Sequence, residues 1–360
     1  MRNRYYHFSK TTVIHATADA PRHSEASIIE LQDGSLLMAW QNHKKSNFGS
    51  GDQAPSNISL MNSFDNGKTW HNERIAAQMA NGCVNVYSPT LFRNSNGSIS
   101  LFFKRYTQLE RGKPQLNSFF RMHSYDEGKT WSEEEILWEN KTFGTLNHAV
   151  KRLSDGSVLI PVTESSGNLW EEGTSFSVYV LRSEDDFSTW ISSNRITVPM
   201  RGLMEPCIAE RSDGTLNMVM RTQLGSVFFS QSSDGGRSWS KAQTTGLKAP
   251  ESCPCIVSIP NSDAQLVIWN NSEYDMSWRS HYGKRTPLTM AISRDGLKSF
   301  TDFFDIESDP QWAFTNPSVT ITSSGLFILN YWACKYTPDG RFNSLVDLKM
   351  ATFRIDLSDN

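Results

Sequence analysis

The chain has few cysteines, no long apolar segment and no excess of basic residues. Its 360 residues include five cysteines, which are too few and too scattered for the disulfide framework of a small secreted domain. No run of about 18 apolar residues occurs, so the sequence predicts no membrane-spanning helix. The formal net charge of −3 argues against a nucleic-acid-binding protein, which normally carries a basic excess. We therefore expect neither a nucleic-acid partner nor a membrane partner.

The N-terminal segment, MRNRYYHFSKTTVIHATADAP, lacks the apolar core of a secretory signal. As given, the sequence predicts a cytoplasmic location, and a secreted or periplasmic location would require an export signal outside this sequence. Cys253 and Cys255 are separated by one proline, which is the wrong spacing for a zinc knuckle. Buried free thiols explain the cysteines better.

One polar turn recurs along the chain. It reads SFDNGKTW at 63–70, SYDEGKTW at 124–131 and SSDGGRSW at 232–239, with degenerate copies SEDDFSTW at 183–190 and SRDGLKSF at 293–300. The aromatic residues that close these turns are 49 to 61 positions apart, which indicates a repeated supersecondary unit. The Asp side chain can accept backbone N–H bonds and the Trp can pack between sheets. We interpret the turn as a stabilising element of the fold rather than a catalytic one.

A second repeat lies out of phase with the first and predicts six β-hairpins. In each, two apolar runs flank a short polar turn, which usually contains Asp-Gly, Asn-Gly or Ser-Gly, a strong hairpin signal. The segments are 27–40, 90–103, 150–162, 208–221, 256–269 and 319–331. Adding the strands on either side of the recurring turns gives a unit of four short antiparallel strands, repeated six times. This pattern predicts an all-β fold, a six-bladed β-propeller forming a single domain over 1–360. Residues 11–17 and 348–357 are expected to share the sixth blade and close the ring.

The recurring turns resemble the Asp boxes of the sialidase (neuraminidase) superfamily, whose BNR-repeat propellers have six blades. The resemblance covers roughly residues 22–331. It extends to six residues in the order that the family requires, namely Arg22, Asp52, Glu205, Arg221, Arg285 and Tyr331. Two local motifs depart from the family pattern: His23-Ser24 stands where Ile-Pro is usual, and Trp332 follows Tyr331 where Glu is common.

The resemblance implies a role for each residue. Arg22, Arg221 and Arg285 would bind the carboxylate that sialic acids carry, because a guanidinium group can hold a carboxylate with two parallel hydrogen bonds. We also expect Glu25, three residues after Arg22, to orient that arginine. His148 and His43, each next to a hairpin arm, are candidate substrate contacts. Further candidates to line the cleft are Arg105, Tyr87 and Arg201.

The catalytic residues implied by the resemblance are Asp52, Glu205 and Tyr331. Tyr331 would be the nucleophile, Glu205 its base, and Asp52 the acid/base that protonates the leaving oxygen. This mechanism predicts an exo-α-sialidase that retains the anomeric configuration and needs no metal or organic cofactor. The predicted partner is an acidic sugar or a sialylated glycan.

Two other functions are compatible with the same sequence. One is a propeller glycosidase or lyase that acts on another acidic sugar, such as a uronate. The other is a carbohydrate-binding propeller without catalytic activity. A binding protein would need the arginines but not Glu205 together with Tyr331, so the sequence favours the enzyme.

Overall fold

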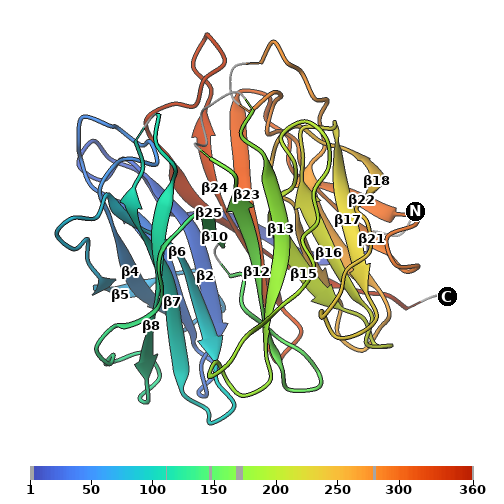
Figure 1. Cartoon of the computed structure of the whole chain (residues 1–360), viewed down its shortest axis with the longest axis horizontal. Helices are drawn as coiled ribbons and strands as arrows, with labels where there is room; N and C mark the ends of the chain where they lie inside the picture. The colour runs from blue at the N-terminus through green and yellow to red at the C-terminus, as the bar shows by residue number, and fades with distance from the viewer. Residues whose placement is uncertain (1–3, 111, 146–147, 168–172, 279–280, 359–360) are drawn as a thin grey trace.

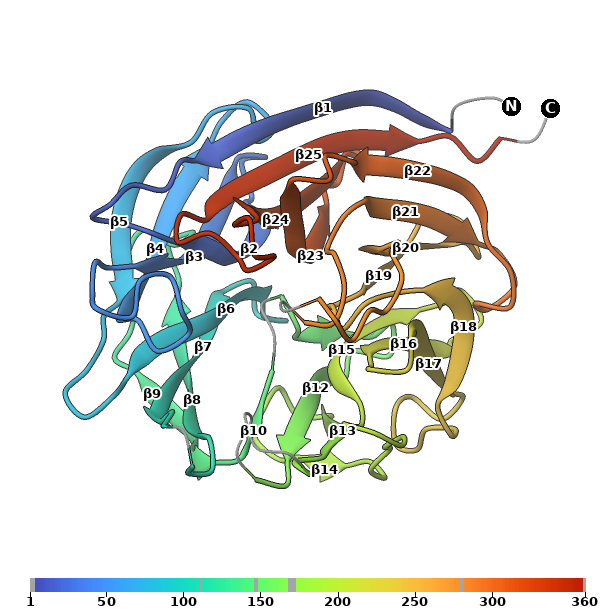
Figure 2. The ribbon, with the colours of Figure 1, turned by 90° about the horizontal axis from the view of Figure 1, so that it is seen from above.

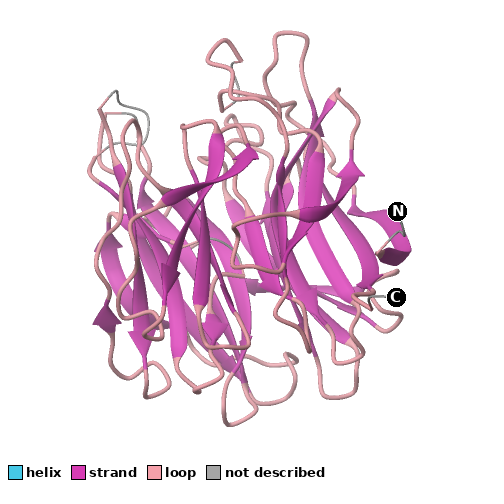
Figure 3. Cartoon of the chain, turned by 90° about the vertical axis from the view of Figure 1, so that its right-hand side faces the viewer, coloured by secondary structure: helices cyan, strands magenta, loops and turns pink. Residues whose placement is uncertain are grey.

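In the computed structural model, six antiparallel sheets surround a common axis. The structure describes residues 4–110, 112–145, 148–167, 173–278 and 281–358, and this part of the chain contains strands, turns and bends but no α-helix (Figure 3). Accordingly, no helix in these ranges could span a membrane. Seen from above, the sheets form a ring with the chain passing from one to the next (Figure 2). The predicted all-β, six-bladed propeller is confirmed.

The first three blades follow one another along the chain, and each has an inner strand near the axis (Figures 1 and 2). Blade one is β2 (His23–Glu30), β3 (Leu36–His43), β4 (Ser56–Ser63) and β5 (His71–Ala77). Blade two is β6 (Asn85–Arg93), β7 (Ile99–Gln108), β8 (Leu116–Ser124) and β9 (Glu135–Lys141). Blade three has a divided inner edge, β10 (Phe143–Gly144) and β11 (Lys151–Arg152), then β12 (Val158–Ser165), β13 (Phe176–Ser183) and β14 (Ile191–Ser192).

The last three blades complete the ring. Blade four is β15 (Met204–Glu210), β16 (Leu216–Arg221), β17 (Ser226–Ser232) and β18 (Gln243–Lys248). Blade five is β19 (Cys255–Ser258), β20 (Gln265–Asn270), β21 (Leu288–Ser293) and β22 (Thr301–Glu307). Blade six is β23 (Trp312–Ile321), β24 (Phe327–Lys335), β25 (Asp347–Ile355) and β1 (Tyr5–Ile14). All six predicted hairpins join the first two strands of a blade.

The two ends of the chain close the ring in blade six, as the sequence predicts. Strand β1 pairs antiparallel with β25, with Tyr5 opposite Ile355 and Lys10 opposite Ala351. The N-terminal strand begins earlier than expected, at Tyr5 rather than Thr11. The sequence does not mark this start, because the polarity of the first residues alternates only weakly. Pairing with β25 determines where the strand begins.

The recurring turns connect the third strand of a blade to its outer strand, and their contacts are the same in all five copies. In the turn at 124–131, Asp126 accepts hydrogen bonds from the backbone N–H of Thr130 (2.9 Å) and from its hydroxyl group (2.6 Å). The hydroxyl group of Ser124 accepts one from the backbone N–H of Gly128 (2.8 Å). Gly128 has a φ of +81°, and a Cβ there would lie 2.5 Å from Leu37 of blade one. The turn therefore joins neighbouring blades.

Tyr331 lies inside blade six, in a buried network that links this blade to blade five. Its side chain is 0% exposed, and its hydroxyl group donates a hydrogen bond to Glu307 of β22 (2.7 Å). Glu307 also accepts hydrogen bonds from Lys10 of β1 (2.9 Å) and from Lys349 of β25. Burial, together with the neighbouring Glu307 carboxylate, raises the pKa of Tyr331 well above its usual value. Tyr331 is therefore a structural residue, and its predicted place in the functional site is wrong.

We expect Ser124→Ala to destabilise the fold. The change removes the acceptor of the buried Gly128 N–H, and an unsatisfied buried donor costs about 1–3 kcal/mol. The free energy of unfolding, measured by chemical denaturation, should fall by that amount. Lys129→Ala, an exposed side chain in the same turn, is the control and should change it little. Equal effects of the two changes would contradict the assigned role of the serine.

Tyr331→Phe should likewise reduce stability without affecting ligand binding. The buried Glu307 carboxylate would lose one donor, and we expect a loss of about 1–3 kcal/mol in the free energy of unfolding. Binding or turnover at the pocket described below should stay within about twofold of the wild-type value, a change of less than about 0.5 kcal/mol. A loss of turnover with unchanged stability would restore Tyr331 as a catalytic residue.

Candidate active site

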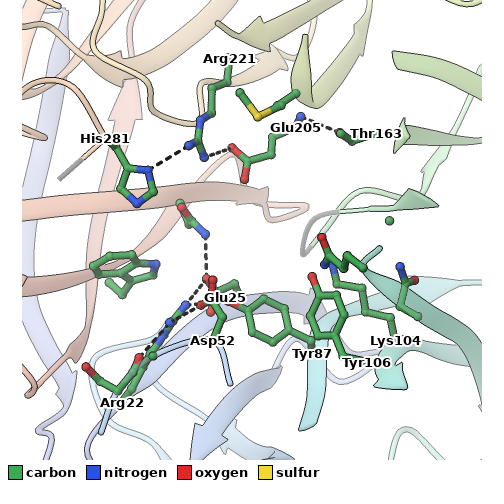
Figure 4. Close-up of a pocket in the computed structure, with 18 of the residues that line it drawn as sticks. Arg22, Glu25, Asp52, Tyr87, Lys104, Tyr106, Thr163, Glu205, Arg221 and His281 are labelled. Carbon is green, nitrogen blue, oxygen red and sulfur yellow. Dashed lines mark hydrogen bonds and ion pairs between the residues drawn. The ribbon is translucent and has the colours of Figure 1, made fainter. Parts of the chain in front are cut away.

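All six blades contribute to one pocket, and this pocket contains most of the residues that the sequence singles out. Arg22, Glu25, Asp52, Glu205, Arg221 and Arg285 all line it. The three arginines come from blades one, four and five, far apart in the chain. Figure 4 shows Arg22, Glu25 and Asp52 on one side and Arg221, Glu205 and His281 on another. The convergence of the predicted arginines on one pocket is therefore observed.

A repeated irregularity in the inner strands aims several of these side chains into the pocket. Strands β2, β6, β15 and β23 each contain a register shift. Within each shift one residue has a positive φ, namely Glu25 (44°), Ser88 (51°), Glu205 (51°) and Asn316 (52°). Such bulges redirect side chains and are common next to active sites, although a positive φ is strained for residues other than glycine. Three of the four side chains line the pocket.

Arg22 has no spare hydrogen-bond donor. All five of its N–H groups have acceptors, which are the hydroxyl group of Ser24 (2.8 Å), the carbonyl oxygen of Ser50 (3.2 Å), Asp52 (2.8 Å), Glu25 (2.9 Å) and the hydroxyl group of Tyr87 (2.9 Å). The expectation that Glu25 orients Arg22 agrees with this geometry. A ligand carboxylate can reach Arg22 only by replacing one of these acceptors, and those on the loop at 44–55 are the ones that can move without breaking a strand.

Asp52 is an exposed loop residue that forms an ion pair with Arg22 (2.8 Å). Its carboxylate also accepts a hydrogen bond from the hydroxyl group of Tyr87 (2.8 Å). Loss of solvent around the carboxylate raises the pKa of Asp52, but Arg22 and the Tyr87 hydroxyl outweigh this effect and hold the pKa at about 2. In the ligand-free pocket Asp52 is therefore ionised at neutral pH and acts as a counter-ion.

Glu205 and Arg221 form an ion pair on the opposite side of the pocket. Arg221 donates to Oε2 of Glu205 (2.8 Å), which also accepts a hydrogen bond from the buried thiol of Cys253 (2.5 Å). Burial raises the pKa of Glu205, yet Arg221 prevails and the net shift is downward. Among the described residues, none donates a hydrogen bond to Oε1 of Glu205, so this oxygen remains available to a ligand or a water molecule.

Glu251 and His281 complete the surroundings of Arg221, and sequence reasoning missed both. Arg221 lies 3.3 Å from a carboxylate oxygen of Glu251, and its Nη2 contacts Nδ1 of His281 (3.1 Å). Burial and the positive charge of Arg285 lower the pKa of His281 to about 4, so the ring is neutral at pH 7 and its Nδ1 can accept this hydrogen bond. Neither residue lies in a motif that marks it.

Arg285 differs from the other two arginines because no carboxylate lies within ion-pair distance of it in the described part of the chain. The side chain is 3% exposed. It donates to the hydroxyl group of Thr315 and to the backbone carbonyl of Glu251 (3.0 Å), while its Nε–H has no acceptor among the residues that the structure describes. A buried cation without a carboxylate is costly unless an anion joins it. Arg285 is thus the arginine best prepared to receive a ligand anion.

Two predicted site residues lie outside this pocket. Tyr331 faces the interior of blade six, and because side chains alternate along a strand, its neighbour Trp332 lines the pocket instead. His148 contacts the hydroxyl group of Ser27 (3.0 Å) and lines a different cavity, formed by the inner strands. The predicted substrate contact of His148 is therefore wrong for the arginine pocket.

Blade two supplies a third wall, formed by Tyr87, Lys104 and Tyr106 (Figure 4). Of these three residues, only Tyr87 was a candidate from the sequence. Arg201, a further candidate, also lines the pocket, whereas the candidates His43 and Arg105 do not line it. In the described ranges no cluster of three His, Cys, Asp or Glu side chains could hold a metal ion. The pocket combines buried cations with carboxylates in different environments, an arrangement that suits an anionic ligand and proton transfer.

Comparison with solved structures places this fold among sialidases. The chain matches an intramolecular trans-sialidase from Ruminococcus gnavus with a TM-score of 0.72 and 14% identity, covering 96% of this chain and 97% of the other. A NanB sialidase mutant from Streptococcus pneumoniae matches with a TM-score of 0.69 and 12% identity, covering 94% and 69%. A protein of unknown function from Dyadobacter fermentans matches with a TM-score of 0.71 and 15% identity, covering 97% and 99%.

The sequence comparisons add the family. A search of curated proteins finds no match. The family model described as a BNR repeat-like domain matches residues 34–329, which is most of the chain and includes all five recurring turns. With its six sialidase-like blades, the chain belongs to the BNR repeat-like domain family.

Proposed function

We propose that this protein is an exo-acting glycoside hydrolase that releases a terminal acidic sugar of the sialic (nonulosonic) acid class. The observation that carries the proposal is Arg285, a buried guanidinium group without a carboxylate partner among the described residues, beside Arg221 in a pocket shared by all six blades. Sialic acids carry a carboxylate on the anomeric carbon. Binding of this group by Arg285 would bring the glycosidic bond into the pocket.

In this proposal the substrate activates Asp52. Arg22 has no free donor, so a substrate carboxylate that approaches it competes with Asp52 for the same guanidinium group. Loss of the Arg22 contact and the nearby negative charge of the substrate both raise the pKa of Asp52. The carboxyl group can then be protonated and donate its proton to the leaving oxygen. Asp52 is thus a counter-ion before binding and an acid afterwards.

Glu205 is the proposed base. A carboxylate is a poor nucleophile toward this substrate, because it would have to approach the sugar's own carboxylate. With Tyr331 buried in blade six, we assign the attack to a water molecule that gives its proton to Oε1 of Glu205. Direct attack by water inverts the anomeric configuration, whereas the expectation of retention rested on Tyr331.

The test is hydrolysis of a sialyl α-glycoside followed by proton NMR. We expect free sialic acid to be released first as the β-anomer, which is the inverted product. Mutarotation then mixes the two anomers. A retained product would contradict the water route. Products with a conjugated double bond, detected by ultraviolet absorbance from a uronate glycan assayed in parallel, would instead indicate a lyase. Binding without turnover of either substrate would indicate a carbohydrate-binding propeller.

Arg285→Met should weaken substrate binding strongly. The variant loses two hydrogen bonds to the substrate carboxylate, which together are worth about 3–6 kcal/mol. Even the lower end of this range is enough to lower kcat/KM about 100-fold. Arg195→Met is the matched control, because Arg195 is exposed in blade three and does not line the pocket. Equal kinetics of the Arg285 variant and the wild type would contradict the assigned role.

The pH dependence tests the role of Asp52. Because the pKa of free Asp52 is about 2, and only its protonated form can act as the acid, kcat/KM should fall as the pH rises from about 4 to 7. The value of kcat should stay level over the lower part of this range, because the bound substrate raises the pKa of Asp52. Asp52→Asn should remove this pH dependence and lower kcat by about 10²–10⁴-fold. A flat profile of kcat/KM in the wild type would contradict the assignment.

A further inference from the structure

Lys104 is a second pocket cation that lacks a carboxylate partner in the described part of the chain. It lies on β7 of blade two, it is 6% exposed, and it lines the arginine pocket. Within the described ranges, the ammonium group donates one hydrogen bond, to the backbone carbonyl of Thr145 (3.1 Å). An ammonium group has three protons, so two remain for other acceptors.

The surroundings of Lys104 hold its ammonium group in place at the pocket wall. The nitrogen lies 5.3 Å from the ring centres of both Tyr87 and Tyr106, within the range of cation–π attraction. Gly144 stands behind it, where an added Cβ would lie 3.2 Å from the nitrogen. Figure 4 shows the lysine beside the two tyrosines, on a different wall from Arg22 and Arg221. A lysine held in this way is positioned to bind a ligand in the pocket, unlike a lysine whose side chain extends into solvent.

The charges of the pocket divide into paired and unpaired groups. Arg22 pairs with Glu25 and Asp52, Arg221 pairs with Glu205, and Arg201 pairs with Glu251. Among the described residues that line the pocket, Arg285 and Lys104 have no carboxylate within ion-pair distance. They come from blades five and two, which lie opposite each other in a six-bladed ring.

We propose that Lys104, flanked by Tyr87 and Tyr106, binds a second anionic group of the ligand, so that the acidic sugar carries a carboxylate or a sulfate in addition to the carboxylate held by Arg285. This inference rests on the proposed function for the first carboxylate. One anion would compensate only one of the two unpaired cations. A sugar with anionic groups on opposite sides of its ring compensates both, which makes the pocket selective for a doubly acidic sugar.

The experiment compares two matched ligands by isothermal titration calorimetry. One is methyl α-sialoside, with one carboxylate. The other is the same compound after periodate has shortened its glycerol side chain and oxidation has converted the new end into a carboxylate. The wild type should bind the diacid about 10- to 100-fold more tightly than the monoacid, which is the contribution of one hydrogen bond to a charged group. A sulfated sialoside separates a sulfate preference from a carboxylate preference.

Variants identify the group responsible. Lys104→Met should abolish the preference for the diacid and leave the affinity for the monoacid unchanged, whereas Lys141→Met, at an exposed position of the same blade, should change neither. Gly144→Ala keeps the charge but crowds the ammonium group, and should reduce the preference in part. Burial lowers the pKa of Lys104 to about 8, so the preference should also decline as the pH rises above that value.

The outcomes distinguish the two proposals. A monoacid that binds through Arg285, with no gain for either second anion, overturns the Lys104 proposal and leaves the hydrolase proposal intact. A Lys104-dependent preference without hydrolysis of either glycoside supports the second site and overturns the hydrolase. Equal weakening of both ligands in Lys104→Met, or no binding of any of them, overturns the second site.

Discussion

Compensation of buried positive charge is the constraint on which this pocket depends. Several guanidinium groups and one ammonium group meet where six blades converge, and each would be unfavourable there without a partner. The protein meets this cost unevenly. All the donors of Arg22 are occupied, and Arg221 lies within ion-pair distance of two carboxylates, those of Glu205 and Glu251. Arg285 and Lys104 have only neutral acceptors among the described residues. The uncompensated groups indicate where a ligand's negative charge is most favourable.

The backbone irregularities of the inner strands make this arrangement possible. A regular strand would send alternate side chains into the spaces between blades, and a carboxylate there would lie in the hydrophobic core. The bulges in β2, β15 and β23 turn Glu25, Glu205 and Asn316 toward the axis instead. Their strained backbone persists because the flanking ladder and the ion pairs hold it. Because the same bulge occurs in several blades, the repeated unit directs side chains into the site as well as forming the fold.

The pocket also departs from the sialidase pattern that the sequence suggests. The tyrosine at the expected position is part of a buried network with Glu307, Lys10 and Lys349, and a tryptophan takes its place at the pocket wall. A one-residue difference on a strand is enough for this exchange, because neighbouring side chains face opposite sides of the sheet. The fold is thus that of the sialidases, while the wall where a tyrosine nucleophile is expected is different.

The sequence by itself determined the propeller, because the hairpin turns and the recurring turns are local signals that repeat from blade to blade. Through its resemblance to a known family, it also singled out the three arginines, Asp52 and Glu205, which the structure brings to one pocket. Only the tertiary structure decided which way Tyr331 faces, that His148 lies in another cavity, and that Lys104, Glu251 and His281 belong to the site. Those outcomes depend on bulges and on contacts between blades, and such contacts join residues too distant in the chain for any local pattern to record.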